Sequence, residues 1–171
     1  IYNILATLAS IYPLIDIKKL KKNVFLNFKT PNGRGDISKI KYKNKQIFLV
    51  DESYNSNPLS LKSAIENYDQ IKLESKSSKK YLVLGDMLEL GKYSVEQHRL
   101  ISKIVNKTKI NQVYVIGKYI KETFKGLKKN KKGKIFNNKS DINDLINNNL
   151  NNSDYLMIKG SNSTGLHELM S

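Results

Sequence analysis

Short apolar runs of strand type alternate with segments of helical periodicity from residue 46 to the end of the chain. The apolar runs span residues 46–50, 81–84, 113–117, 134–136 and 154–158. This alternation predicts a mostly parallel sheet, because consecutive parallel strands are joined by crossover helices that pack on the sheet faces. We therefore expect an α/β, Rossmann-like fold with helices on both faces. A leading β-hairpin should be formed by residues 37–42 and 46–50.

The start of the chain has a different pattern. Residues 2–12 are predicted to form a helix that Pro13 ends, and a second helix is predicted after Asp16. Residues 30–36 form a loop with two glycines, where we place a domain boundary. The expected domains are residues 1–34, a helical remnant of a preceding domain, and residues 35–171. The first residue is not Met and the helical pattern is already under way, so we expect the beginning to be missing.

The chain carries a formal net charge of +15 and contains no cysteine. The lack of cysteine excludes disulfides and thiolate metal sites and fits a reducing compartment. No run of about 18 apolar residues occurs, so no membrane-spanning helix is expected. The charge invites a nucleic-acid hypothesis. However, most basic residues are Lys, which accompanies Asn and Ile, and A/T-rich codons encode all three. A basic α/β module that binds RNA or another polyanion through residues 128–134 stays open as an alternative.

Three polar loops follow predicted strands, at residues 51–57, 85–91 and 159–163. Loops at the carboxyl ends of parallel strands converge on one edge of the sheet, where open α/β sheets bind their ligands. The first loop combines carboxylates, hydroxyls and carboxamides just before Pro58, which suits the first turn of a helix. This loop alone allows two interpretations, a binding site or a polar strand-to-helix turn.

The second loop does not match a nucleotide phosphate loop. That pattern needs four residues between its two glycines and a Ser or Thr directly after Lys. Five residues separate Gly85 from Gly91 here, and Tyr93 follows Lys92. The chain therefore has no phosphate loop of this kind.

Several titratable side chains lie in or near these loops. Asp86 and Glu89 are candidates for a catalytic carboxylate pair, with a helix cap or loop anchor as the alternative for Asp86. His98, on the helix that follows, is a candidate functional residue, although a lone helical histidine more often packs or makes a buried hydrogen bond. Lys159 and Ser161 after the last strand suit an anionic group, and the alternative is an exposed glycine turn.

Three motifs, taken in chain order, resemble one family. Residues 51–58, DESYNSNP, are similar to the D-D-S-Y-N-A-N-P signature of the Mur ligases, in the branch that adds D-alanyl-D-alanine to a muramoyl tripeptide. Residues 84–91, LGDMLELG, with His98 behind them, resemble its L-G-D-M-L-E-L-G motif, and residues 158–161, IKGS, resemble its V-K-G-S. Gly33-Arg34 and Asn3-Ile4-Leu5-Ala6 also occur in the family's order. The chain is thus identified as similar to the C-terminal part of a Mur ligase.

The resemblance implies an ATP-dependent amide-bond ligation. In this family the substrate carboxylate is activated as an acyl phosphate, which the dipeptide amine then attacks. The implied nucleotide contacts are Asn3 at the adenine, Arg34, and Glu52 at the ribose hydroxyls. The family usually has Asp at the position of Glu52.

The resemblance also implies a set of residues on the side that receives D-alanyl-D-alanine. These substrate-binding residues are Tyr54, Asn55, Asn57, Lys159 and Ser161. Lys159 suits the free carboxylate of the dipeptide, because a charge-assisted hydrogen bond to a carboxylate is a strong one. Asp86 and His98 are expected to support the loop or the site.

Other parts of the machinery are implied to lie upstream. In the family, the phosphate loop, the magnesium-binding carboxylates and the muramoyl-binding domain precede this part, and residues 1–34 correspond to the end of the central ATP-binding domain. We therefore expect no catalytic residue and no metal site in this chain, and no turnover by it alone.

The implied full-length enzyme uses ATP and Mg²⁺. Its partners would be UDP-N-acetylmuramoyl-tripeptide and D-alanyl-D-alanine. We expect a monomer in the bacterial cytoplasm that binds neither nucleic acid nor a membrane. A Mur ligase with another amino-acid substrate is a further alternative, against which the residues of the loops 54–57 and 85–91 argue.

Overall fold

The computed structural model describes residues 2–21, 23–24, 26 and 33–161. The chain divides into two compact units, Ile1–Thr30 and Pro31–Ser171. This division lies slightly before the predicted boundary, so that Arg34 belongs to the second unit. The assignment of the first unit to an ATP-binding domain stays a prediction.

The first unit contains the helix α1 (Tyr2–Ile11) and one 3₁₀ turn (Ile17–Lys19). The predicted second helix is wrong in its extent. Among the described residues this 3₁₀ turn is followed only by separate turns, in which the Val24 amide donates to Lys21 O at 3.1 Å and the Leu26 amide donates to Asn23 O at 2.9 Å. The Asp16 carboxylate accepts a hydrogen bond from the Lys18 amide at 3.0 Å, which starts the turn. Leu20 then adopts an extended backbone conformation, which ends it.

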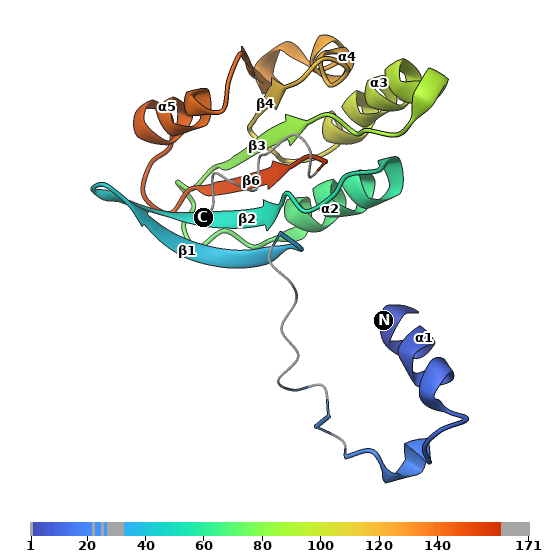
Figure 1. The fold of residues 1–171 in the computed structure, drawn as a ribbon. Coiled ribbons are helices and arrows are strands. Elements are labelled where there is room, and N and C mark those ends of the chain that lie inside the picture. The colour runs from blue at the N-terminus through green and yellow to red at the C-terminus, as the bar shows by residue number, and fades with distance from the viewer. Residues whose placement is uncertain (1, 22, 25, 27–32, 162–171) are drawn as a thin grey trace. The chain divides into compact units, whose positions relative to one another are not determined.

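The second unit is built on a six-stranded sheet (Figure 1). Its strands are β1 (Asp36–Tyr42), β2 (Lys45–Glu52), β3 (Lys80–Gly85), β4 (Gln112–Ile116), β5 (Lys132–Phe136) and β6 (Tyr155–Lys159). They lie in the order β1-β2-β6-β3-β4-β5, and only the hairpin pair β1 and β2 is antiparallel. The last strand is therefore inserted between β2 and β3, which brings the ends of three strands together.

Helices cover both faces of this sheet. They are α2 (Pro58–Gln70), α3 (Ser94–Val105), α4 (Lys121–Lys125) and α5 (Ser140–Asn148), with short 3₁₀ turns at Gly91–Tyr93 and Lys129–Lys131. Side chains of a strand alternate between faces. Accordingly, Phe48 and Val50 of β2 join a core with α2 and α3, whereas Ile47 and Leu49 join a second core with α5. The predicted α/β class with helices on both faces is confirmed.

The start of α2 follows directly from its sequence. The Asn57 side chain accepts a hydrogen bond from the Ser60 amide at 2.8 Å, and the Ser60 hydroxyl accepts one from the Asn57 amide at 3.0 Å. This reciprocal pair is a capping box, and Pro58 occupies the first helical turn without losing a needed donor. The cap fixes where the polar loop 51–57 ends.

Three lysines at the amino ends of strands bind carbonyl groups that lie at or just beyond the ends of helices. The Lys80 ammonium donates to the carbonyls of Asp69 and Ile71 at 2.6 and 2.7 Å, at the end of α2. The Lys45 ammonium donates to Leu150 O at 2.8 Å, just after α5. The Lys131 ammonium donates to Thr108 O and Ile110 O, each at 2.7 Å, just after α3. Ammonium groups there satisfy carbonyls that have no partner within the helix.

None of the helices in the described part of the chain has both the length and the apolar character needed to cross a membrane.

Candidate functional site

The carboxyl ends of β2, β6 and β3 lie next to one another. Lys159 of β6 is paired in register with Glu52 of β2 on one side and with Leu84 of β3 on the other. The loops that follow these strands enclose a cavity of about 560 Å³. It is lined by Tyr54, Asn55, Ser56, Asn57, Leu88, Glu89, Leu90 and Ser161. The three polar loops singled out from the sequence thus meet around one cavity.

Lys159 lies buried beneath the first loop rather than in the cavity wall. Its side chain is 2% exposed, and its ammonium lies 3.2 Å from a carboxylate oxygen of Glu52. The same ammonium donates to the carbonyl oxygens of Asn55 at 2.9 Å and of Glu52 at 3.4 Å. All three contacts are to residues of the loop 51–57, so Lys159 holds this loop against β6.

Hydrogen bonds within the loop 51–57 fix its path. The Asp51 carboxylate accepts from both the amide and the hydroxyl of Ser53, which is fully buried. The Asn55 side-chain oxygen accepts from the Ser56 amide at 2.7 Å. The Ser56 hydroxyl is buried without a hydrogen-bond partner among the described residues. The loop is therefore rigidly held and still has an unused hydroxyl.

The segment before β1 packs on the same loop. The Tyr54 amide donates to Gly33 O at 3.2 Å, and the Arg34 guanidinium lies 4.3 Å from the centre of the Tyr54 ring, a cation–π contact. Gly35 has a φ of +90°, and a Cβ there would come within 2.6 Å of a carboxylate oxygen of Glu52. The positive φ and the close approach to Glu52 both favour a glycine at this point.

Asp86 anchors a neighbouring loop. Its carboxylate oxygens accept from the amides of Lys118 at 2.8 Å and Ile120 at 2.7 Å, just before α4. Gly117, with a φ of +138°, leaves room for this carboxylate, since a Cβ there would lie 2.6 Å from Asp86 Cγ. Of the two interpretations of Asp86, the geometry favours the loop anchor over a catalytic pair with Glu89.

His98 is fully buried, and its ring connects the loop 85–91 to the first residue of α3. Its Nε2 accepts a hydrogen bond from the Met87 amide at 2.9 Å, and its Nδ1 lies 2.6 Å from Ser94 O. An acceptor at Nε2 and a donor at Nδ1 together define the neutral tautomer with hydrogen on Nδ1. His98 therefore shapes the loop from below and does not face the cavity.

Ser161 connects the three loops. Its amide donates to Asp86 O at 3.1 Å, and its hydroxyl accepts from the Leu88 amide at 3.1 Å and lies 3.3 Å from Ser56 O. One small residue after β6 thereby ties the loop after β2 to the loop after β3.

The structure places the residues predicted from the sequence at different depths. Tyr54, Asn55, Asn57 and Ser161 line the cavity, while Lys159 and Glu52 form the pair beneath it. Arg34 reaches the site through the Tyr54 ring. The side chain of Asn3 lies outside the described residues.

Four further residues line the cavity. Ser56, Leu88 and Leu90 were not predicted to bind a ligand, and Glu89 was predicted only as a catalytic partner of Asp86. Only their position in the sequence could have indicated them, because they lie in the loops that follow β2 and β3, and any residue of these loops can line the cavity.

No group of three or more His, Cys, Asp or Glu side chains that could hold a metal ion occurs among the described residues.

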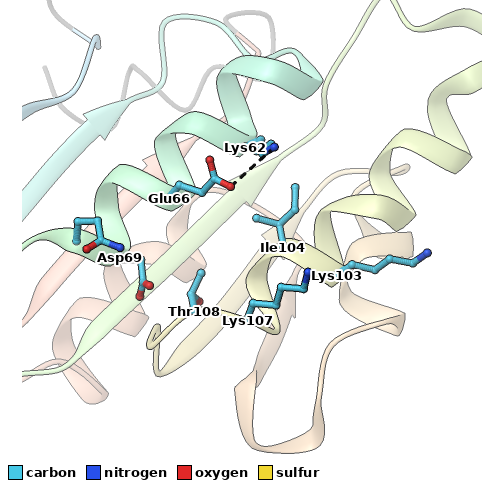
Figure 2. Close-up of a pocket in the computed structure, with 8 residues that line it drawn as sticks. Lys62, Glu66, Asp69, Lys103, Ile104, Lys107 and Thr108 are labelled. Carbon is cyan, nitrogen blue, oxygen red and sulfur yellow. Dashed lines mark ion pairs between the residues drawn. The ribbon is translucent and has the colours of Figure 1, made fainter.

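A second hollow, of about 290 Å³, lies between α2 and α3 (Figure 2). Both basic and acidic side chains line this hollow. Two of them, the exposed Lys62 and Glu66, form an ion pair in which the charged atoms lie 4.0 Å apart. Such a pair contributes little. This hollow shares no residue with the loops that the sequence singled out, and its charges do not converge on one ligand type.

A polar cavity at the carboxyl ends of parallel strands defines a Rossmann-like α/β ligand-binding domain. Residues 38–162 match the protein family described as "Mur ligase, glutamate ligase domain". The chain therefore belongs to the Mur ligase family.

Curated relatives share one name, UDP-N-acetylmuramoyl-tripeptide–D-alanyl-D-alanine ligase. The protein from Buchnera aphidicola subsp. Acyrthosiphon pisum is 34% identical over 71% of this chain and 26% of its own length. The protein from Bacillus subtilis is 30% identical over 72% of this chain and 27% of its own length. The chain thus spans about a quarter of the length of these relatives.

Solved structures show the same fold. The MurF ligase from Thermotoga maritima in complex with ADP gives a TM-score of 0.70 at 24% identity, covering 98% of this chain and 36% of that chain. MurF from Acinetobacter baumannii gives a TM-score of 0.72 at 20% identity, covering 97% of this chain and 34% of that chain.

Proposed function

We propose that this chain is the C-terminal domain of an ATP-dependent ligase that joins D-alanyl-D-alanine to UDP-N-acetylmuramoyl-tripeptide. The observation that carries the proposal is the cavity at the ends of β2, β3 and β6, where all three family motifs meet around one space. The shared name of the curated relatives at 30–34% identity supports the substrates. A fold shared with other Mur ligases would not by itself select them.

The proposed nucleotide contacts are Arg34 and Glu52, with Asn3 at the adenine. Arg34 is exposed, and the Glu52 side chain is 26% exposed despite its contact with Lys159. A carboxylate oriented by a buried ammonium suits two ribose hydroxyls, because it accepts hydrogen bonds and keeps its position. The described residues therefore fit one edge of a nucleotide.

The proposed dipeptide side is the cavity itself. Asn55 and Asn57 supply carboxamides, and Leu88 and Leu90 supply apolar surface that suits the methyl groups of alanyl residues. Lys159 was predicted to meet the dipeptide carboxylate. Because its ammonium is engaged by Glu52 and Asn55, we now propose that it positions the loop.

The chemistry proposed for the whole protein is that of the family. The tripeptide carboxyl group is activated as an acyl phosphate, and the dipeptide amine displaces phosphate to form the amide. Mg²⁺ would be held by another part of the full-length protein, since the described residues offer no cluster of ligands for it. The part played by this domain is to orient the nucleotide and the amine component when it closes on the rest of the protein.

The setting is proposed on the same grounds. We expect a monomer in the bacterial cytoplasm that binds neither nucleic acid nor a membrane. The alternative of a polyanion-binding module finds no support in the relatives. Within the basic segment 128–134, Lys131 is buried and donates to two carbonyls, so this segment presents less charge than its sequence indicates.

The direct test is ligation by the full-length protein. It should form the amide product from UDP-N-acetylmuramoyl-tripeptide, D-alanyl-D-alanine and ATP, with one ADP released for each product. Glu52→Gln should raise the KM for ATP while Glu66→Gln, a change on the exposed face of α2, leaves it unaltered. A wild-type protein that forms no product with this dipeptide would remove the proposed substrate. An unchanged KM for ATP in Glu52→Gln would remove the nucleotide role of Glu52.

A further inference from the structure

The cavity has one formally charged side chain among its lining residues. Of the eight, Glu89 alone carries a charge, and the others are carboxamides, hydroxyl groups and leucines. The nearby charges of Glu52 and Lys159 offset each other beneath the loop. The side chains that line the cavity therefore carry one negative charge, although the whole chain is strongly basic and Arg34 lies against the Tyr54 ring.

The Glu89 carboxylate is available to a ligand. Glu89 is exposed, and it makes no hydrogen bond or ion pair with any other described residue. The buried hydroxyl of Ser56, another lining residue, also lacks a partner among the described residues. The walls thus hold one unused anion and one unused hydroxyl.

The backbone of Glu89 is in an unusual conformation for its residue type. Its φ is +64°, in the left-handed region that Gly or Asn adopts with less strain. A strained residue of this kind in a ligand cavity motivates a functional hypothesis. A glycine would adopt this backbone conformation with less strain, but it would not place a carboxylate in the cavity wall.

We infer that the Glu89 carboxylate binds the ammonium group of the incoming amine substrate. The inference rests on the proposed function, because it assigns the amino end of the dipeptide to this cavity. A free α-amino group has a pKa of about 8, so the amino end of the dipeptide is largely a positively charged ammonium group near neutral pH. A carboxylate forms a charge-assisted hydrogen bond with such a group. The methyl groups then find apolar surface at Leu88 and Leu90, which also line the cavity.

The test compares Glu89→Gln with Glu96→Gln in the full-length protein. Glu96 is an exposed acid in the first turn of α3 and does not line the cavity, so its variant has the same change in charge. Glu89→Gln should raise the KM for D-alanyl-D-alanine by about tenfold, the loss expected for one hydrogen bond to a charged group. The KM values for ATP and the muramoyl tripeptide should not change, and Glu96→Gln should match the wild type.

A second ligand distinguishes loss of the contact with the ammonium group from a general distortion of the cavity by Glu89→Gln. N-acetyl-D-alanyl-D-alanine lacks the ammonium group, so it should inhibit the wild type and Glu89→Gln with the same constant. Equal weakening of both ligands by Glu89→Gln would overturn the inference, and so would an unchanged KM for the dipeptide. Glu89→Gly adds a further check, because it should raise the melting temperature by relieving the backbone strain while still raising the KM.

The inference and the proposed function can fail separately. If the wild type forms no product from the dipeptide, the proposed function fails. Calorimetric titration of D-alanyl-D-alanine into the same full-length proteins then decides the role of Glu89. No binding, or equal affinity in the wild type and Glu89→Gln, overturns the inference, and a loss confined to Glu89→Gln upholds it.

Discussion

Lys159 and Glu52 are opposite each other in the register of β6 and β2, and their charged groups lie 3.2 Å apart. The pair sits where two parallel strands end, and the lysine is buried while the carboxylate keeps an edge in solvent. The ammonium also holds two carbonyls of the loop beyond β2. Lys159 thus orients the carboxylate of Glu52, which is proposed to bind the nucleotide. It also fixes the path of the loop that carries Tyr54 and Asn55.

Lys159→Met should destabilise the chain by about 2 kcal/mol. The substitution leaves the Glu52 carboxylate and the Asn55 carbonyl without their donor, and the partial exposure of Glu52 keeps the loss below that of a fully buried pair. Urea unfolding measures the change. Lys62→Met, which removes the exposed pair with Glu66, serves as the control and should change stability by less than about 0.5 kcal/mol. Equal losses in the two variants would contradict the role given to Lys159.

Asp86→Ala should cost about 3 kcal/mol, because the amides of Lys118 and Ile120 lose a charged acceptor. Chemical denaturation of the variant gives the value, and Asp144→Ala, at an exposed position in α5, is the matched control. The two changes Asp86→Ala and Gly117→Ala should also be non-additive. The Cβ introduced at Gly117 meets the Asp86 carboxylate, so Gly117→Ala should cost less when Asp86 is already alanine. Strict additivity would argue against this close approach.

Stability should fall at alkaline pH because of buried tyrosines. Burial raises the pKa of Tyr114 to about 12, and burial also raises the pKa values of Tyr68 and Tyr81. In the unfolded chain these phenols lose their protons near pH 10, whereas the folded chain retains them, so the free energy of unfolding decreases as the pH rises from about 10 towards 12. Tyr114→Phe should flatten the decrease, which urea unfolding on either side of about pH 10 would reveal.

Two buried lysines act in the opposite direction. Burial lowers the pKa values of Lys80 and Lys131, so the folded chain releases these protons before the unfolded chain does, and stability rises as the pH approaches about 10.5. The tyrosine loss should therefore dominate only above that range. A profile that falls with the same slope in Tyr114→Phe as in the wild type would contradict the assignment to Tyr114.

The chain by itself should neither hydrolyse ATP nor form the amide. Its sequence contains no phosphate loop, since the spacing of Gly85 and Gly91 and the Tyr93 after Lys92 both break that pattern. Release of ADP from ATP by the purified chain, compared with the full-length protein as the positive control, measures this directly. Turnover by the chain alone would contradict the proposal that other parts of the full-length ligase bind the phosphates and Mg²⁺.

Most of the sheet was predictable from the sequence, because strands such as residues 81–84 are short, apolar and bounded by polar loops. The position of β6 between β2 and β3 was not, since strand order is decided by contacts between distant segments. The helix predicted after Asp16 was wrong in extent, because a cap and a basic run suit a single turn as well as a helix. Local pattern does not distinguish the two.

The candidate site was predictable as a set of loops but not as a set of contacts. Polar motifs after β2, β3 and β6 converge because parallel strands end at one edge. The roles within the loops depend on depth, which a sequence does not reveal. Lys159 is engaged by the loop, Asp86 by two amides, and Glu89 lines the cavity.

Lys45, Lys80 and Lys131 lie at the opposite edge of the sheet, each binding the carbonyls that follow a helix. Part of the formal charge is therefore internal to the fold and not offered to a partner. A reagent that acylates amines should label these three lysines, like the buried Lys159, later than the exposed lysines, and their labelling should report opening of the domain rather than its surface. Lysine reactivity, read residue by residue, would then measure local unfolding at the ends of α2, α3 and α5.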